Sequence, residues 1–245
     1  MEIKSICKVS LLIGFLLLFA CKKDNIDRRE INVKLQKFNV IDVNSTFDVF
    51  LTQDTAFSLK IVGEEKFVND VVYQVNDNVL SLSVNSGSLW LSPKRNKISV
   101  FINCDSLKLL NVNETSMIKT LTPIVTHEFG MIMNGKLNEA ELDLAGDVFY
   151  YWNIHPCGGK ITLKGDVNVL KLWNVGLMEI DALNLTTSAA LIENKSKGSC
   201  SINVIDKLEY RISGEGNIYL IAVQHNIYRR PADPHTKVED PVISV

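Results

Sequence analysis

The chain has 245 residues, of which 46% are hydrophobic and 22% charged, so it is able to bury a core and is not a disordered chain. Its formal net charge is -2, from 26 basic and 28 acidic residues. This balance offers no basic surface for nucleic acid, and it argues against electrostatic docking on anionic lipid.

Residues 1–20 have the pattern of a secretory signal peptide. Lys4 and Lys8 precede the apolar run VSLLIGFLLLFA, which is too short to span a bilayer. The run leads directly into Cys21, and the stretch LLFAC resembles the lipobox of bacterial lipoproteins. That resemblance implies cleavage before Cys21, acylation of its thiol and attachment to a membrane. The alternative is an ordinary signal peptide that happens to be followed by a cysteine.

A polar spacer is expected at residues 21–37, which begin CKKDNIDRRE. Lys22, rather than an aspartate, follows the cysteine, and similarity to known sorting rules favours the outer membrane on that ground. The expected location is therefore the cell envelope, as an outer membrane lipoprotein on either leaflet.

From residue 38 onward the sequence predicts strand after strand. The stretch FNVIDVNSTFDVFLTQ alternates apolar and polar residues around a short turn, and NDN in VVYQVNDNVLSLSV predicts a hairpin turn. One short helix is expected near Glu64. Residues 223–245 contain the proline-rich stretch PADPHTKVEDP and are expected to form a C-terminal cap or tail. The fold class is therefore all-β.

Polar turn residues recur with a period of about 20 residues. Asparagine and glycine adopt a positive φ most readily, so a turn that needs this conformation once per coil would select them. The pattern predicts a β-solenoid of about 20 residues per coil, preceded by a strand-rich N-terminal block, with one such turn residue in each coil. These residues are Asn113, Asn134, Asn153, Asn174, Asn194 and Gly214.

Two tryptophans share a position in this repeat. Trp152 and Trp173 each precede one of the asparagines, next to Tyr151 and Leu172, which are expected to face inward. Because successive side chains of a strand point to opposite faces, both tryptophans are expected on the outside of adjacent coils. Exposed neighbouring aromatic rings are suited to binding a sugar or a protein partner. The alternative is that residues 38–105 cover both rings.

The cysteines of the expected mature chain, apart from Cys21, give no metal or disulfide pattern. Cys104, Cys157 and Cys200 are odd in number, and their spacing matches no zinc site. Cys157 and Cys200 would lie about two coils, or roughly 10 Å, apart, whereas a disulfide needs less than about 7 Å. We expect buried, reduced thiols.

An enzymatic interpretation depends on two acidic residues. Asp147 and Asp166 are separated by nearly one coil length, so they could form a carboxylate pair on adjacent coils, as in carbohydrate-active β-helix enzymes, or hold calcium. No third acid follows at the next coil, and two Gly-Asp turns explain the pattern more simply. No metal motif, cofactor motif or catalytic constellation is present in the sequence, so no cofactor is expected.

Several stretches resemble the putative auto-transporter adhesin family, head GIN domain. They are FNVIDVNSTFDVFLTQ, LKIVGEEKFVNDVVYQVNDNVLSLSV, ISVFINCDSLKLLNV and LEYRISGEGNIYL, and together they extend over residues 38–222. The resemblance implies an all-β, solenoid-like domain in a secreted or lipid-anchored bacterial protein, without catalytic residues that carry over. Asparagines stand here where the family often has Ser-Gly turns.

Two functions of different class follow. The first is a non-catalytic protein that is attached to the membrane through Cys21 and binds a glycan or a surface-protein partner through Trp152 and Trp173. The second is a carbohydrate-active enzyme that uses Asp147 and Asp166.

Overall fold

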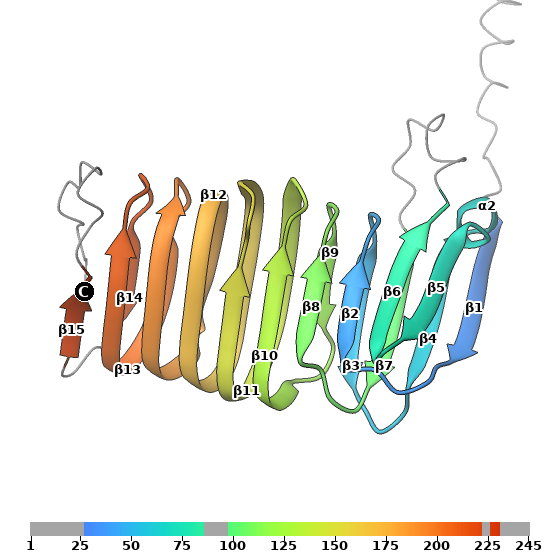
Figure 1. The fold of residues 1–245 in the computed structure, drawn as a ribbon, viewed down its shortest axis with the longest axis horizontal. Coiled ribbons are helices and arrows are strands. Elements are labelled where there is room, and N and C mark those ends of the chain that lie inside the picture. Colours follow the sequence, from blue (N-terminus) through green and yellow to red (C-terminus); the bar gives the residue numbers. More distant parts are fainter. Residues whose placement is uncertain (1–26, 86–97, 222–225, 231–245) are drawn as a thin grey trace, which may run out of the picture.

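The protein is a flattened β-solenoid of about six turns, with roughly 21 residues per turn (Figure 1). This computed structural model describes residues 27–85, 98–221 and 226–230, so Cys21 and the expected signal peptide lie outside it. The predicted all-β solenoid is confirmed, and the coils are close to the predicted length.

The described residues form a single sheet that closes around one core, with one helix of a single turn. The elements are β1 (Arg28–Lys34), β2 (Val40–Val43), β3 (Asp48–Gln53), β4 (Ser58–Glu64), α2 (Glu65–Val68), β5 (Val71–Asn76), β6 (Val79–Val84), β7 (Ser99–Cys104), β8 (Leu109–Val112), β9 (Met117–Thr120), β10 (Ile124–Met133), β11 (Leu137–Trp152), β12 (Cys157–Ser196), β13 (Cys200–Ile212), β14 (Ile218–Ile221) and β15 (Asn226–Arg229).

The long strands bend around the molecule and contribute to both of its flat faces. The aromatic face, named for Trp152 and Trp173, contains β5, β6, β2, β8 and β10, then the second halves of β11 and β13, and β15. The charged face contains β1, β4, β7, β3 and β9, then the first halves of β11 and β13, and β14. Strand β12 passes through both faces, because its 40 residues make about two coils.

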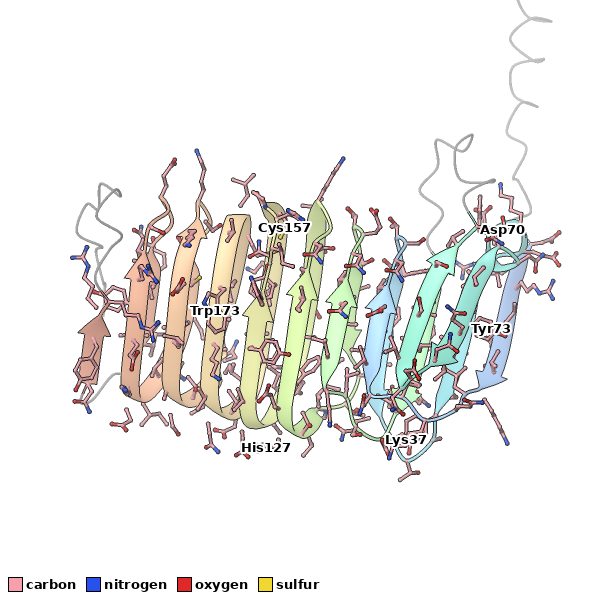
Figure 2. The ribbon with its side chains drawn as sticks, viewed as in Figure 1. Lys37, Asp70, Tyr73, His127, Cys157 and Trp173 are labelled. Carbon is pink, nitrogen blue, oxygen red and sulfur yellow. The ribbon has the colours of Figure 1, made fainter. Side chains whose placement is uncertain are left out.

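Two long edges join the faces. Figure 2 labels Cys157 and Asp70 on one of them, the upper edge, and His127 and Lys37 on the other, the lower edge. Turns such as residues 134–136 and 153–156 form the upper edge.

Parallel pairing holds the coils in register, so that inward side chains stack in columns. Phe129, Phe149 and Leu170 form one such column, and Phe129 and Phe149 have ring centroids 5.7 Å apart. Tyr151 and Leu172 form the next, and both are fully buried, as predicted. Because successive side chains of a strand point to opposite faces, buried and exposed residues alternate along each strand, as the sequence pattern does.

The N-terminal block continues the solenoid and closes its end. Strand β2 lies between β6 and β8, and β3 lies between β7 and β9, so a segment from early in the chain forms a coil in the middle of the stack. The antiparallel strands β1 and β5 lie at the two ends of the sheet order. Residues 28–34, expected within the polar spacer, form β1, and its sequence RREINVK carries the charged side chains that disfavour pairing of an edge strand with other chains.

Two local predictions are confirmed. The NDN stretch is the hairpin turn between β5 and β6, where Asp77 and Asn78 have φ values of 50° and 65°. The short helix expected near Glu64 is α2. No helix within the described ranges has both the length and the apolar character needed to cross a membrane.

The prediction that the repeated asparagines adopt a positive φ is wrong. Among the described non-glycine residues only Asp77 and Asn78 have a positive φ, and Gly214 does not have one either. A glycine is required at position 214 because the backbone of the preceding coil approaches closely. A Cβ at this position would lie 2.3 Å from the carbonyl oxygen of Ser196.

The asparagines belong to two columns that face opposite ways. Met131 aligns with Tyr151, and continuing this register shows that Asn153 falls one position short of the partner of Asn134. A shift of one position turns a side chain to the other face of a strand. Asn113 and Asn134 are therefore at least partly exposed, and their amides bond to each other. The others point into the core, and they are Asn153, Asn174 and Asn194.

The inward asparagines act as partners for the backbone at the upper edge. Asn153 Nδ2 donates to the carbonyl oxygens of Val175 at 2.5 Å and His155 at 3.2 Å, and its Oδ1 accepts from the Val175 N–H at 2.8 Å. Asn174 Nδ2 donates to the Met178 carbonyl oxygen at 2.8 Å. These amides satisfy polar groups where the chain turns and the regular ladder is interrupted.

The thiols are buried and reduced, as predicted. Cys104, Cys157 and Cys200 are all free. Burial raises the pKa of the Cys104 and Cys200 thiols to about 12, so neither ionises near neutral pH.

Candidate functional site

Trp152 and Trp173 lie directly beside each other on adjacent coils of the aromatic face. The two residues are register partners in the pairing of β11 with β12, and neither is buried, so both side chains lie on the outside of the solenoid. Figure 2 labels Trp173 on this face. Trp152 is 48% exposed and Trp173 is half-buried. The described residues within 38–105 form other coils of the same solenoid and do not cover the pair, because Trp152 keeps half of its surface.

Apolar side chains surround this pair on the same face. Ile132 is the register partner of Trp152 on the preceding coil, and Ile154, two residues after Trp152, is 57% exposed. Tyr150 lies two residues before Trp152, and its ring covers Gly130, where a Cβ would lie only 2.0 Å from a ring atom. The tryptophans are thus part of a continuous apolar surface across three coils, of the kind that marks binding sites on soluble domains.

A network of ion pairs borders this surface on the C-terminal coils. Arg211 donates to Glu193 at 2.8 Å, and Arg230 donates to Glu209 at 3.0 Å. The hydrogen bonds from Lys207 and Arg230 lower the pKa of the Glu209 carboxyl. The apolar surface therefore has a polar rim at this end, but opposite charges neutralise each other within it.

The opposite face has a different chemistry. Its outward side chains form ion pairs across neighbouring coils: Lys119 with Glu141, Lys164 with Asp143 at 3.0 Å, and Lys160 with Glu179 at 3.3 Å. Such exposed pairs are well hydrated and offer little apolar area to a partner. Of the two faces, the aromatic one is thus better suited to binding.

The two acids of the enzymatic interpretation are not brought together. Asp166 aligns with Ala145, whereas Asp147 forms hydrogen bonds with His127 and with Asn168. His127 Nδ1 lies 2.5 Å from Asp147 Oδ2, and the Asn168 amide donates to Oδ1 at 2.6 Å. These bonds lower the pKa of the Asp147 carboxyl, first through His127 and then through Asn168.

The cluster at Asp147 lies at the lower edge and is open to water. The His127 side chain is 84% exposed, and Asp147 is 47% exposed. Proton transfer needs groups whose pKa lies near the working pH, whereas Asp147 is held in its charged form. Among the residues that the structure describes, no group of three or more His, Cys, Asp or Glu side chains could hold a metal ion.

Sequence patterns identified the tryptophans but not the rest of the apolar surface. Nothing in the sequence marks Tyr150, Ile132 and Ile154 as outward-facing, because an apolar residue in a strand is more often buried. The signal that could have found them is the coil period, since the register partner of an outward residue also faces outward.

A family model described as "Putative auto-transporter adhesin, head GIN domain" matches residues 37–222. A search among curated proteins found no match.

Solved structures of low sequence identity share the fold. A putative adhesin from Bacteroides fragilis has a TM-score of 0.71 and 18% identity, over 83% of this chain and 94% of that one. A putative lipid binding protein from Parabacteroides distasonis has a TM-score of 0.61 and 18% identity, over 84% of this chain and 95% of that one. A putative adhesin from Parabacteroides merdae has a TM-score of 0.53 and 19% identity, over 84% and 94%. Since the family model covers most of the solenoid, the chain belongs to the putative auto-transporter adhesin family with a head GIN domain.

Proposed function

We propose that this protein is a non-catalytic adhesin of the cell envelope, anchored by lipid at Cys21, which binds a glycan or a surface protein through its aromatic face. The observation that carries the proposal is the register pairing of two outward tryptophans, Trp152 and Trp173, within an apolar surface. Indole rings provide a large contact area at a low entropic cost, and they are frequent binding hot spots.

The family supports this proposal at a coarser level. Its description as an adhesin family points to a protein of the cell surface or envelope, and two of the three structural neighbours named above are described as adhesins. The LLFAC stretch supplies the sequence argument for the lipid anchor.

The double variant Trp152→Ala/Trp173→Ala tests the binding face. We expect loss of retention on a glycan array, or of binding to target cells, by at least about tenfold, because hot-spot truncations cost about 2 kcal/mol or more. The matched control is Tyr219→Ala, since Tyr219 is a 40% exposed aromatic residue on the charged face. Binding that survives the double variant, or that Tyr219→Ala removes equally, contradicts the assignment.

The anchor has its own test. Cys21→Ser should abolish incorporation of labelled palmitate and release the protein from the membrane fraction, because only the Cys21 thiol would carry the lipid. The control Cys200→Ser changes a thiol that is fully buried in the fold, so labelling should persist. Unchanged labelling in Cys21→Ser would exclude the lipid anchor.

The carbohydrate-active enzyme remains the second hypothesis, but no observation favours it. Asp147 is bonded to His127 and Asn168 rather than to Asp166, so the carboxylate pair that this hypothesis required is not formed. If the purified protein released reducing sugar and Asp147→Asn abolished this release, the result would support the enzymatic hypothesis.

A further inference from the structure

Three exposed apolar side chains lie at the upper edge on consecutive coils: Ile154 in the turn after β11, Leu137 at the start of β11, and Leu177 within β12. Leu137, Ile154 and Leu177 are 49%, 57% and 62% exposed, and the latter two are among the most exposed large hydrophobic residues of the described chain. Leu137 and Leu177 lie on either side of Gly158, since a Cβ there would lie 4.0 Å from Leu137 Cδ1 and 3.5 Å from Leu177 Cβ. Exposed apolar residues grouped in this way mark a contact surface.

Lysines accompany these apolar tips along the same edge. Lys136 is exposed beside Leu137, and Lys195 is exposed on the turn of the next coil after Leu177. Lys197 on that turn is exposed as well, but it pairs with Glu215 at 3.0 Å. Protruding Leu and Ile side chains with lysines beside them are typical of segments that insert into the boundary between lipid headgroups and acyl chains.

The chain enters the solenoid at this same edge. The Asp27 carbonyl oxygen accepts a hydrogen bond from the Glu65 N–H at 2.9 Å, which places Asp27 beside α2 at the upper edge (Figure 1). Only six residue steps separate Cys21 from Asp27, and they span at most about 20 Å. A lipid on Cys21 would therefore hold this edge, rather than the lower one, close to the bilayer.

The apolar tips lie at a distance from this entry point. Five strand spacings separate β1 from β11, along the order β1, β4, β7, β3, β9, β11, so Leu137 is about 24 Å from the entry. Leu177 is two coils further, at about 34 Å. A contact at that distance would fix the orientation of the solenoid, which a flexible tether alone cannot do.

We propose that Leu137, Ile154 and Leu177 form a second membrane contact, which inserts into the bilayer surface and lays the upper edge of the solenoid along it. A second weak contact at the same bilayer adds to the anchor, because the tether keeps this edge at a high effective concentration near the lipid. The balanced charge of the chain makes this contact apolar rather than electrostatic. The orientation, but not the contact itself, rests on the proposed anchor at Cys21. The charged face would then stand clear of the bilayer, and the aromatic face would meet it only at its border, where Ile154 lies.

The experiment uses the unacylated chain from residue 22 onward, which contains every described residue, with vesicles of pure phosphatidylcholine. We expect measurable co-sedimentation, weaker than the roughly 10⁴ M⁻¹ of a single myristoyl chain. The triple variant Leu137→Ser/Ile154→Ser/Leu177→Ser should lower the partition coefficient by about tenfold or more while the melting temperature stays close to that of the parent, because the three side chains are exposed. The matched control is Leu121→Ser/Val125→Ser, since these residues are 52% and 59% exposed near the lower edge.

Three results would overturn the proposal. They are no co-sedimentation of the parent chain, equal co-sedimentation of the triple variant, and an equal loss in Trp152→Ala/Trp173→Ala, which would move the lipid contact to the aromatic face. Binding of the parent chain to a protein partner through the upper edge, without binding to vesicles, would also contradict it. None of these results depends on acylation, so they are separate from a failure of the proposed anchor.

A second measurement avoids the triple substitution. The native thiols at Cys104, Cys157 and Cys200 are buried, so a polarity-sensitive maleimide dye will label an introduced cysteine selectively. The dye on Ile154→Cys should shift to the blue when vesicles are added, and the dye on Val125→Cys should not. Equal shifts at both positions, or none at Ile154→Cys, would count against the upper edge as the lipid contact.

Discussion

Asn153→Ala is expected to destabilise the solenoid by about 2–5 kcal/mol, because the change removes the partner of several backbone groups at once. The Asn153 amide donates to two carbonyl oxygens and accepts from the Val175 N–H, and its side chain is 1% exposed. Each buried group that loses its partner costs about 1–3 kcal/mol. Thermal unfolding followed by circular dichroism measures the effect, at about 2–4 °C per kcal/mol for a chain of this size.

The control for this prediction is Asn113→Ala. Asn113 belongs to the same series of asparagines in the sequence, but its side chain is exposed and bonds to Asn44 and Asn134. A surface change of this kind costs about 0.5 kcal/mol or less. Equal melting temperatures for Asn113→Ala and Asn153→Ala would mean that the inward asparagine does not support the turn.

The architecture could be predicted from the sequence because the period is long and repeated. Strand alternation correctly assigned Tyr151 and Leu172 to the core, and the shared position of Trp152 and Trp173 in the repeat correctly made them neighbours. Both inferences use only the period of two within a strand and the coil length, which hold through the middle of the stack.

The role of the asparagines could not be predicted in the same way. The spacing between Asn134 and Asn153 is one residue shorter than the local coil. This difference is no larger than the variation in length from one coil to the next, so the sequence alone does not reveal it. That one position nevertheless turns the side chain from the surface into the core. Sequence spacing does not show how many residues each corner contains. An amide that bonds the backbone of the next coil and a residue with a positive φ are both plausible uses of asparagine in a turn.

The order of the first coils was also beyond the sequence. Strand β2 pairs with β8, which comes much later in the chain, and the side chains of Asp42 and Asn111 bond across this pair at 2.7 Å. Strands with similar alternating patterns cannot be told apart by sequence as pairing partners. Which of them lie side by side is decided only by how their side chains pack in the closed core. For the same reason, sequence spacing left open a carboxylate pair of Asp147 and Asp166 beside the simpler interpretation as two Gly-Asp turns, and the register separates the two acids.

Leu172→Ala is expected to destabilise the protein by about 2–5 kcal/mol, as truncations of fully buried leucines do. Leu172 is fully buried in the column that it shares with Tyr151, in the middle of the stack, where the coils on either side are held by their own pairings and cannot close the cavity. The adjacent variant Trp173→Ala removes a larger side chain, yet it should cost less, because this ring is half-buried and faces outward. Urea unfolding of both variants gives the comparison. A loss of stability in Trp173→Ala as large as that in Leu172→Ala would mean that the indole is part of the packed structure, and a binding role for the aromatic face would then lack its central residue.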